Sequence, residues 1–194
     1  ILQLETTSPD GTELKSYVCL PKDASADKPA PAILVAPEWW GVVEFVQKVT
    51  ERLARAGFAA VAMDVYGEGK LTTDANQAIE WMEQMLANQD QLMARCQAIL
   101  KDFCDVQGVD SKRLGGIGFC FGGKIVLDMA REGLPLQAVA TFHGNLTPKQ
   151  PAEKGKFAAK VLVAQGEADT MTTMDDVEKF KAEMDNADVD YTVD

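Results

Sequence analysis

Histidine and closely spaced cysteines are what this sequence lacks. The 194 residues include a single histidine, and the four cysteines form no C-x-x-C pair; they are Cys19, Cys96, Cys104 and Cys120. Zinc sites are built from clustered cysteine and histidine ligands, so we expect no metal site. Cysteines in strand-like and helical segments are typical of buried free thiols. We therefore expect a reducing, cytoplasmic compartment.

Long apolar runs and positive charge are also scarce. No run approaches the roughly 20 residues of a membrane span, and no signal-peptide pattern is present, although a chain that starts at Ile1 rather than Met leaves room for a preceding segment. Lys and Arg number 19 against 30 Asp and Glu, which gives a net charge of −11. Nucleic acids and anionic membranes both need a basic face, so neither is predicted as a partner. We expect a small-molecule substrate and a monomer or small homo-oligomer.

What the sequence does contain is an alternation of strand and helix patterns. A turn at Ser8-Pro9-Asp10-Gly11 joins two hairpin strands, and short apolar runs then alternate with segments of helical periodicity. This order predicts one α/β domain over residues 1–194, with parallel βαβ units behind an antiparallel N-terminal edge hairpin. Strands are predicted at 1–7, 12–20, 32–36, 58–63, from 114 to the next glycine turn, and at 136–142, 160–164 and 190–194. Helices are predicted at 42–56, at 74–104 with a break near 88–90, from about 125, and at 174–186.

The glycines around Cys120 form the clearest motif. Gly118-Phe119-Cys120-Phe121-Gly122 places a cysteine at the centre of the G-x-nucleophile-x-G pattern of a nucleophile elbow. In such a strained strand-to-helix turn, larger side chains at the flanking positions would collide with the adjoining backbone. The free N–H groups of the following helix would face the group that the sulfur attacks. The pattern favours a nucleophile over a buried, inert cysteine.

The same stretch also begins like a phosphate-binding loop. Gly118-x-x-x-x-Gly123-Lys124 matches G-x-x-x-x-G-K-[ST] up to its last position, where Ile125 cannot bind magnesium. The dinucleotide fingerprint G-x-G-x-x-G fails, because Phe121 stands where its last glycine is needed. Nucleotide binding is therefore the less favoured alternative.

Ligands of parallel sheets bind at the carboxyl ends of the strands. The residues at those ends are Glu38, Asp64, Cys120, His143 and Asp169. Asp169 follows the candidate nucleophile, as a triad acid does in hydrolases of this architecture, but it could instead cap the next helix. Glu38 lies beside two tryptophans, where partial desolvation would let it exchange a proton with a thiol; a solvated loop residue is the equal alternative.

His143 is the single histidine of the chain. It precedes Asp169, which is the wrong order for the triad of a hydrolase of this architecture. We interpret it as a pocket-wall or hydrogen-bonding residue, and a stand-in catalytic base is the less favoured alternative.

Taken together and in order, five segments make the chain resemble the dienelactone hydrolase family of α/β-hydrolases. The resemblance covers nearly the whole chain and implies a three-layer sandwich with a mostly parallel central sheet. It also implies cofactor-free hydrolysis of a lactone or small ester, with Cys120 as nucleophile and an acyl-thioester intermediate. The segments are Glu38-Trp39-Trp40-Gly41, Asp64-Val65-Tyr66-Gly67, Ile117 to Gly123, Phe142-His143-Gly144 and Gly166-Glu167-Ala168-Asp169.

Site roles follow from the resemblance in the same way. Asp169 would orient the histidine of a Cys-His-Asp triad, and Glu38 would take the thiol proton when substrate displaces it. The backbone N–H groups of Phe121 and Trp39 would form the oxyanion hole. Trp40 and His143 would be pocket residues.

The departure from the family is the triad histidine, because no histidine follows Asp169. The family places it in a loop after the strand that follows the last helix, and here that strand is 190–194. We therefore expect that the chain lacks its C-terminal segment, and a truncated, inactive form is the alternative. If the triad is incomplete, the runner-up function is a non-catalytic binding protein of the same fold. The arginines that hold a substrate carboxylate in some members have no match, so the sequence leaves the substrate open.

Overall fold

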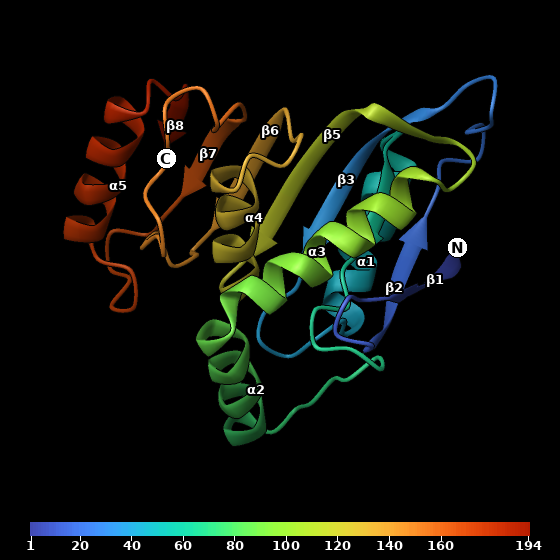
Figure 1. Cartoon of the computed structure of the whole chain (residues 1–194), viewed down its shortest axis with the longest axis horizontal. Helices are drawn as coiled ribbons and strands as arrows, with labels where there is room; N and C mark the ends of the chain where they lie inside the picture. The colour runs from blue at the N-terminus through green and yellow to red at the C-terminus, as the bar shows by residue number, and fades with distance from the viewer.

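The predicted alternation of strands and helices builds one eight-stranded sheet. In the computed structural model, which describes all 194 residues, the strand order is β1-β2-β4-β3-β5-β6-β7-β8 (Figure 1). The first two strands are antiparallel to each other, β2 is antiparallel to β4, and the rest of the sheet is parallel. The predicted edge hairpin is confirmed. The strands are β1 (Leu2–Thr7), β2 (Glu13–Cys19), β3 (Ala30–Ala36), β4 (Ala59–Ala62), β5 (Val109–Phe119), β6 (Ala138–Phe142), β7 (Lys160–Ala164) and β8 (Tyr191–Val193).

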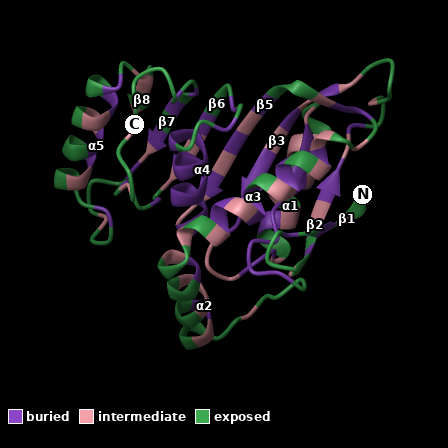
Figure 2. Cartoon of the chain, in the orientation of Figure 1, coloured by how far each residue is buried: buried purple, intermediate pink, exposed green.

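Five helices pack on the sheet, and four of them lie on the same face. The large core cluster joins apolar side chains of α2, α3, α4 and α5 to inward residues of the sheet such as Leu34 and Val163. Figure 2 shows α4 buried almost throughout, whereas α2 keeps an exposed outer side. None of the helices combines the length and the apolar character that crossing a bilayer requires. The helices are α1 (Glu44–Arg55), α2 (Ala75–Ala87), α3 (Gln89–Cys104), α4 (Phe121–Arg131) and α5 (Met174–Asn186).

The second face of the sheet carries α1 alone. A small cluster centred on Val35, Val46 and Ala62 packs this helix over β3 and β4. Further along the same face, an apolar hollow of about 420 Å³ runs across β5, β6 and β7, and Leu162 at its far side is 39% exposed. The second helical layer of the sandwich thus covers one part of the sheet and leaves the strands β5 to β7 open.

Strand β2 keeps the wet face that the alternation of its residues indicates, since Glu13 and Lys15 are exposed while Leu14, Ser16 and Val18 are buried on the other side. Two other local details differ from the sequence pattern. The helical spacing of Val42, Phe45 and Val46 predicts that they share one face of α1, but Phe45 is 47% exposed and its ring packs on Phe119. The sequence also predicts a turn over residues 108–113, but β5 already begins at Val109.

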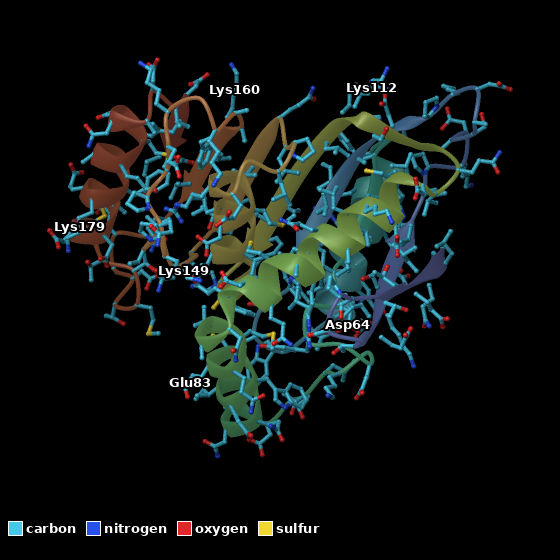
Figure 3. All side chains as sticks on the ribbon, viewed as in Figure 1. Asp64, Glu83, Lys112, Lys149, Lys160 and Lys179 are labelled. Carbon is cyan, nitrogen blue, oxygen red and sulfur yellow. The ribbon has the colours of Figure 1, made fainter.

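The start of β5 is irregular because its pairing with β3 shifts. Ala30 pairs with Val109, but Ala32 pairs with Leu114, so residues 111–113 fall outside the ladder. Beyond that point β5 runs straight to the glycine turn. The parallel strands then end at one edge of the sheet, where Figure 3 labels Asp64, whereas Lys112 and Lys160 lie at the opposite edge. The residues to examine for function lie at the Asp64 edge.

Candidate active site

Cys120 occupies a turn that only glycine neighbours permit. It lies between β5 and α4 with φ 54° and ψ −116°, in the left-handed region that non-glycine residues rarely adopt. A Cβ on Gly118 would stand 2.0 Å from the carbonyl oxygen of Gly122, and a Cβ on Gly122 would stand 2.1 Å from the carbonyl oxygen of Ala36. Both neighbours are backbone atoms that cannot swing away. The glycine pattern is therefore a steric requirement of this turn.

The thiol of Cys120 lies among negative charges. Burial raises its pKa above the ordinary value, and the carboxylates of Glu38 and Asp169 raise it further, while the backbone N–H of Phe121 acts against them by hydrogen bonding to the sulfur. Both predicted carboxylates thus lie near enough to the sulfur for their charges to act on it. A thiol in this setting is protonated at neutral pH and needs a proton acceptor before it can attack.

The loop after β3, residues 38–41, has its carbonyl oxygens engaged but leaves three of its N–H groups without an internal acceptor. Its first three carbonyl oxygens accept, in chain order, from the N–H of Gly41 at 3.4 Å, the hydroxyl of Tyr66 at 2.9 Å and the N–H of Thr72 at 3.1 Å. The backbone N–H groups of Glu38, Trp39 and Trp40 donate to no backbone carbonyl. With its carbonyls engaged, the loop can offer these N–H groups, that of Trp39 among them, to a ligand.

Asp169 is held in a loop after β7 by three hydrogen bonds. The N–H groups of Met171 and Thr172 donate to Oδ1 at 2.8 and 3.2 Å, and the side-chain amide of Gln165 donates to Oδ2 at 2.9 Å. These bonds, the backbone ones foremost, lower the pKa of Asp169 below its ordinary value. Asp169 does not cap the next helix, because Thr173 does so. The carboxylate is ionised, and Oδ2 keeps acceptor capacity for a further donor.

His143 lies at the end of β6 next to this carboxylate. It is close enough for a coulombic interaction that helps to lower the pKa of Asp169. The residue is exposed and has a φ of 44°, and its backbone N–H donates to the carbonyl of Ala164 at 3.0 Å. The structure therefore brings His143 to the acid side of the site.

Two other sequence candidates serve the fold instead. Asp64 is buried, and its oxygens accept from the backbone N–H groups of Lys15, Gly67 and Gly69, each at 2.8 Å. Lys124, the lysine of the phosphate-loop pattern, is buried; its Nζ donates to the carbonyl of Thr147 at 2.8 Å and pairs with Asp128 at 2.9 Å. An ammonium group that is already paired inside the protein is not free to receive a phosphate, which argues against the nucleotide alternative.

Sequence reasoning missed two residues of the site. Gln165 follows β7 and holds Asp169, and Tyr66 follows β4 and reaches the Trp39 carbonyl from 27 positions away. Tyr66 lies within a segment that the sequence analysis had marked, and Gln165 directly precedes another. Only the position at a strand end could have signalled them, since no local pattern demands either contact.

The sheet order and the elbow at the end of β5 define an α/β-hydrolase, as comparisons with known proteins also show. The sequence model described as "Dienelactone hydrolase family" matches residues 14–194. This chain belongs to the dienelactone hydrolase family.

The relatives agree with this assignment. The chain is 28% identical over 201 residues to a "Putative carboxymethylenebutenolidase" of Yersinia pestis, covering 97% of this chain and 74% of that protein. It is 30% identical to the structure named "m3DLH", with a TM-score of 0.92 over 100% of this chain and 79% of the other. A dienelactone hydrolase-like promiscuous phosphotriesterase from metagenomic libraries is also 30% identical, with a TM-score of 0.90 over 99% of this chain and 80% of that one. Further curated relatives are matched over 60 to 66% of their length.

Proposed function

We propose that this protein hydrolyses a lactone or small carboxylic ester, with Cys120 as the nucleophile. The observation that carries the proposal is the backbone of Cys120, held in the left-handed region at the first turn of α4 by glycines that no larger residue could replace. Such strain persists where the surrounding structure enforces it, and it is concentrated at functional sites. The sulfur would attack the ester carbonyl carbon, expel the alkoxide and leave an acyl-thioester that water then cleaves.

Formation of the thiolate requires a proton acceptor. Because the pKa of Cys120 is raised, the resting side chain is a thiol. Glu38 is half-buried and near enough for its charge to act on the sulfur, which supports its role as the group that takes the thiol proton when substrate is bound.

The negative oxygen of the tetrahedral intermediate would be bound by two backbone N–H groups. The N–H of Phe121 faces the sulfur at the start of α4, where the helix dipole favours negative charge. The N–H of Trp39 donates to no carbonyl in the fold, which supports its role as the second donor.

The base for deacylation is proposed to be a histidine that follows Asp194, oriented by Asp169. Oδ2 of Asp169 keeps room for such a donor, and the relatives of this chain are longer than the part that it matches. His143 is the alternative base, favoured by its position beside Asp169. A binding protein without catalysis is the second candidate function, and it is favoured only by the missing histidine.

The first test is the nucleophile. p-Nitrophenyl acetate should acylate the protein once, and mass spectrometry of a digest should find the acetyl group on Cys120. Cys120→Ala should lower p-nitrophenol release by at least about 10³-fold, whereas Cys104→Ala, which changes a partly exposed thiol on α3, should change it little. Equal release by wild type and Cys120→Ala would show that the proposed nucleophile is wrong.

The second test is the base. The chain of 194 residues and the chain as its gene encodes it should be compared for turnover after the first acylation. The proposal expects sustained turnover from the encoded chain and its loss on replacing the histidine after position 194. His143→Ala should then leave turnover within a few-fold. Loss of turnover in His143→Ala would instead make that residue the base, and an encoded chain that contains no such histidine and shows no turnover would favour the binding protein.

A further inference from the structure

One side chain contacts both residues whose N–H groups are the proposed oxyanion hole. The ring of Tyr66 stacks on Phe121, with centroids 6.2 Å apart and planes 13° from parallel, and its hydroxyl donates to the carbonyl of Trp39 at 2.9 Å. We propose that Tyr66 is a positioning residue that fixes the backbone of Trp39 so that its N–H faces the reacting oxygen. The inference rests on the proposed function, because the negative oxygen arises only in that reaction.

The loop needs this contact because its own hydrogen bond is weak. The N–H of Trp39 and the carbonyl of Glu38 belong to one planar peptide group, so whatever holds that carbonyl also aims the N–H. The carbonyl accepts from Gly41 at 3.4 Å, which is long for a hydrogen bond. The bond from Tyr66 to the next carbonyl is shorter and comes from a side chain outside the loop. It is therefore the stronger constraint on the orientation of the two peptide groups.

Tyr66 can act as a fixed point because its own backbone is clamped. Arg95 of α3 is buried, and its Nη1 donates to the carbonyl oxygens of Val65 at 3.0 Å and Tyr66 at 2.8 Å. The other guanidinium N–H groups bind Asp10 and Thr12 of the β1–β2 turn. All five donors of the arginine are thus engaged, which holds the guanidinium in one orientation.

The ring and the hydroxyl are fixed as well. Trp81 of α2 packs against the ring with centroids 5.5 Å apart. Burial, and then the neighbouring Cys120 sulfur, raise the pKa of the Tyr66 hydroxyl, so it stays protonated and donates across the neutral range. A continuous set of contacts therefore leads from the β1–β2 turn through Arg95 and Tyr66 to the Trp39 carbonyl.

The experiment compares two reactions of one sulfur in the variant Tyr66→Phe. Acylation by p-nitrophenyl acetate passes through a negative oxygen, whereas alkylation by iodoacetamide does not. Tyr66→Phe keeps the ring and removes the hydroxyl, so we expect acylation to slow by about 10- to 100-fold, mainly in the maximal rate and not in the substrate concentration at half-maximum. Alkylation should stay within about two-fold of wild type. The matched control is Tyr17→Phe, because its hydroxyl donates at 2.9 Å to Glu51 on the α1 side of the sheet.

The outcomes separate a positioning role from a structural one. Selective loss of acylation in Tyr66→Phe, with both reactions unchanged in Tyr17→Phe, supports the proposal. Unchanged acylation overturns it, and so does an equal loss of both reactions, which would indicate general damage to the site. If Tyr66→Phe does not fold, Arg95→Lys takes its place, since a lysine cannot span both carbonyls and should give the same selective loss in weaker form.

Amide hydrogen exchange provides a readout that needs no reaction. The N–H groups of Gly41 and Thr72, which bond to the 38–41 loop, should exchange faster in Tyr66→Phe than in wild type or Tyr17→Phe. If the wild type is not acylated at all, the proposed function fails, and exchange alone then decides the role of Tyr66. Unchanged exchange at both amides would overturn that role.

Discussion

The two sides of the candidate site are built in different ways. The elbow side, which comprises Cys120, Phe121 and the 38–41 loop, is fixed by backbone atoms that approach so closely that a Cβ would not fit. The acid side, which comprises Asp169, Gln165 and His143, is fixed by hydrogen bonds in a loop after β7, and the nearby Gly166 has open space around it. Close backbone contacts restrict the elbow side to one conformation. The hydrogen bonds of the acid side allow its loop to shift by small amounts. A site of this kind can hold the attacking atom rigidly while it accepts a base from another part of the chain.

The largest expected effect is a difference in stability between two glycine-to-alanine variants, one on each side of the site. Gly122→Ala should lower the free energy of unfolding by about 3 kcal/mol or more, because its Cβ would stand within 2.6 Å of Ala36 and Pro37 backbone atoms. Gly166→Ala should change it by no more than about 0.5 kcal/mol, since nothing lies within 4 Å. Urea denaturation of both variants measures the contrast. Similar losses would mean that the two sides are equally constrained.

A smaller effect is expected from the hydrogen bonds of the acid side. Gln165→Leu removes the amide that donates to Asp169 and to the carbonyl of Thr172, so it should lower the free energy of unfolding by about 1 to 2 kcal/mol. The loss is limited because Oε1 of Gln165 is buried without a partner, and the substitution removes that cost. It should also raise the pKa of Asp169, which this bond helps to lower.

The control for that prediction is Gln137→Leu. Gln137 is exposed and donates to the carbonyl of Lys112 at 3.1 Å, far from the site. Denaturation should show little change for this variant, and the pKa of Asp169, followed by NMR titration, should stay at its wild-type value. A Gln165→Leu protein as stable as wild type would mean that the two backbone N–H groups alone hold Asp169.

The same difference explains how far the sequence predicted the site. The elbow was predictable because the steric requirement at Cys120 acts on residues two positions away, where the sequence displays it. The contact of Tyr66 with Trp39 was not predictable, because the two residues are 27 positions apart and the local sequence around neither of them requires it. Asp64 was placed at the correct edge, but the sequence could not indicate that backbone N–H groups would turn its carboxylate inward. The apolar run of β7 gives no sign that Leu162 is exposed, because cover of that face depends on helices elsewhere in the chain.

The smallest expected effect is on the pKa of Cys120, which a carboxylate from each side of the site raises. Glu38 and Asp169 both raise the pKa of Cys120, so Glu38→Gln and Asp169→Asn should each lower that pKa and speed alkylation by iodoacetamide at pH 7 a few-fold. Glu38 has the larger influence of the two, so its replacement should give the larger increase. In the wild type the alkylation rate should still be rising at pH 9, because burial places the pKa of Cys120 above the ordinary value.

Glu44→Gln, an exposed change in the first turn of α1, is the control and should leave the pH profile of alkylation unchanged. A larger increase from Asp169→Asn would mean that the acid side, and not the 38–41 loop, governs the proton on Cys120.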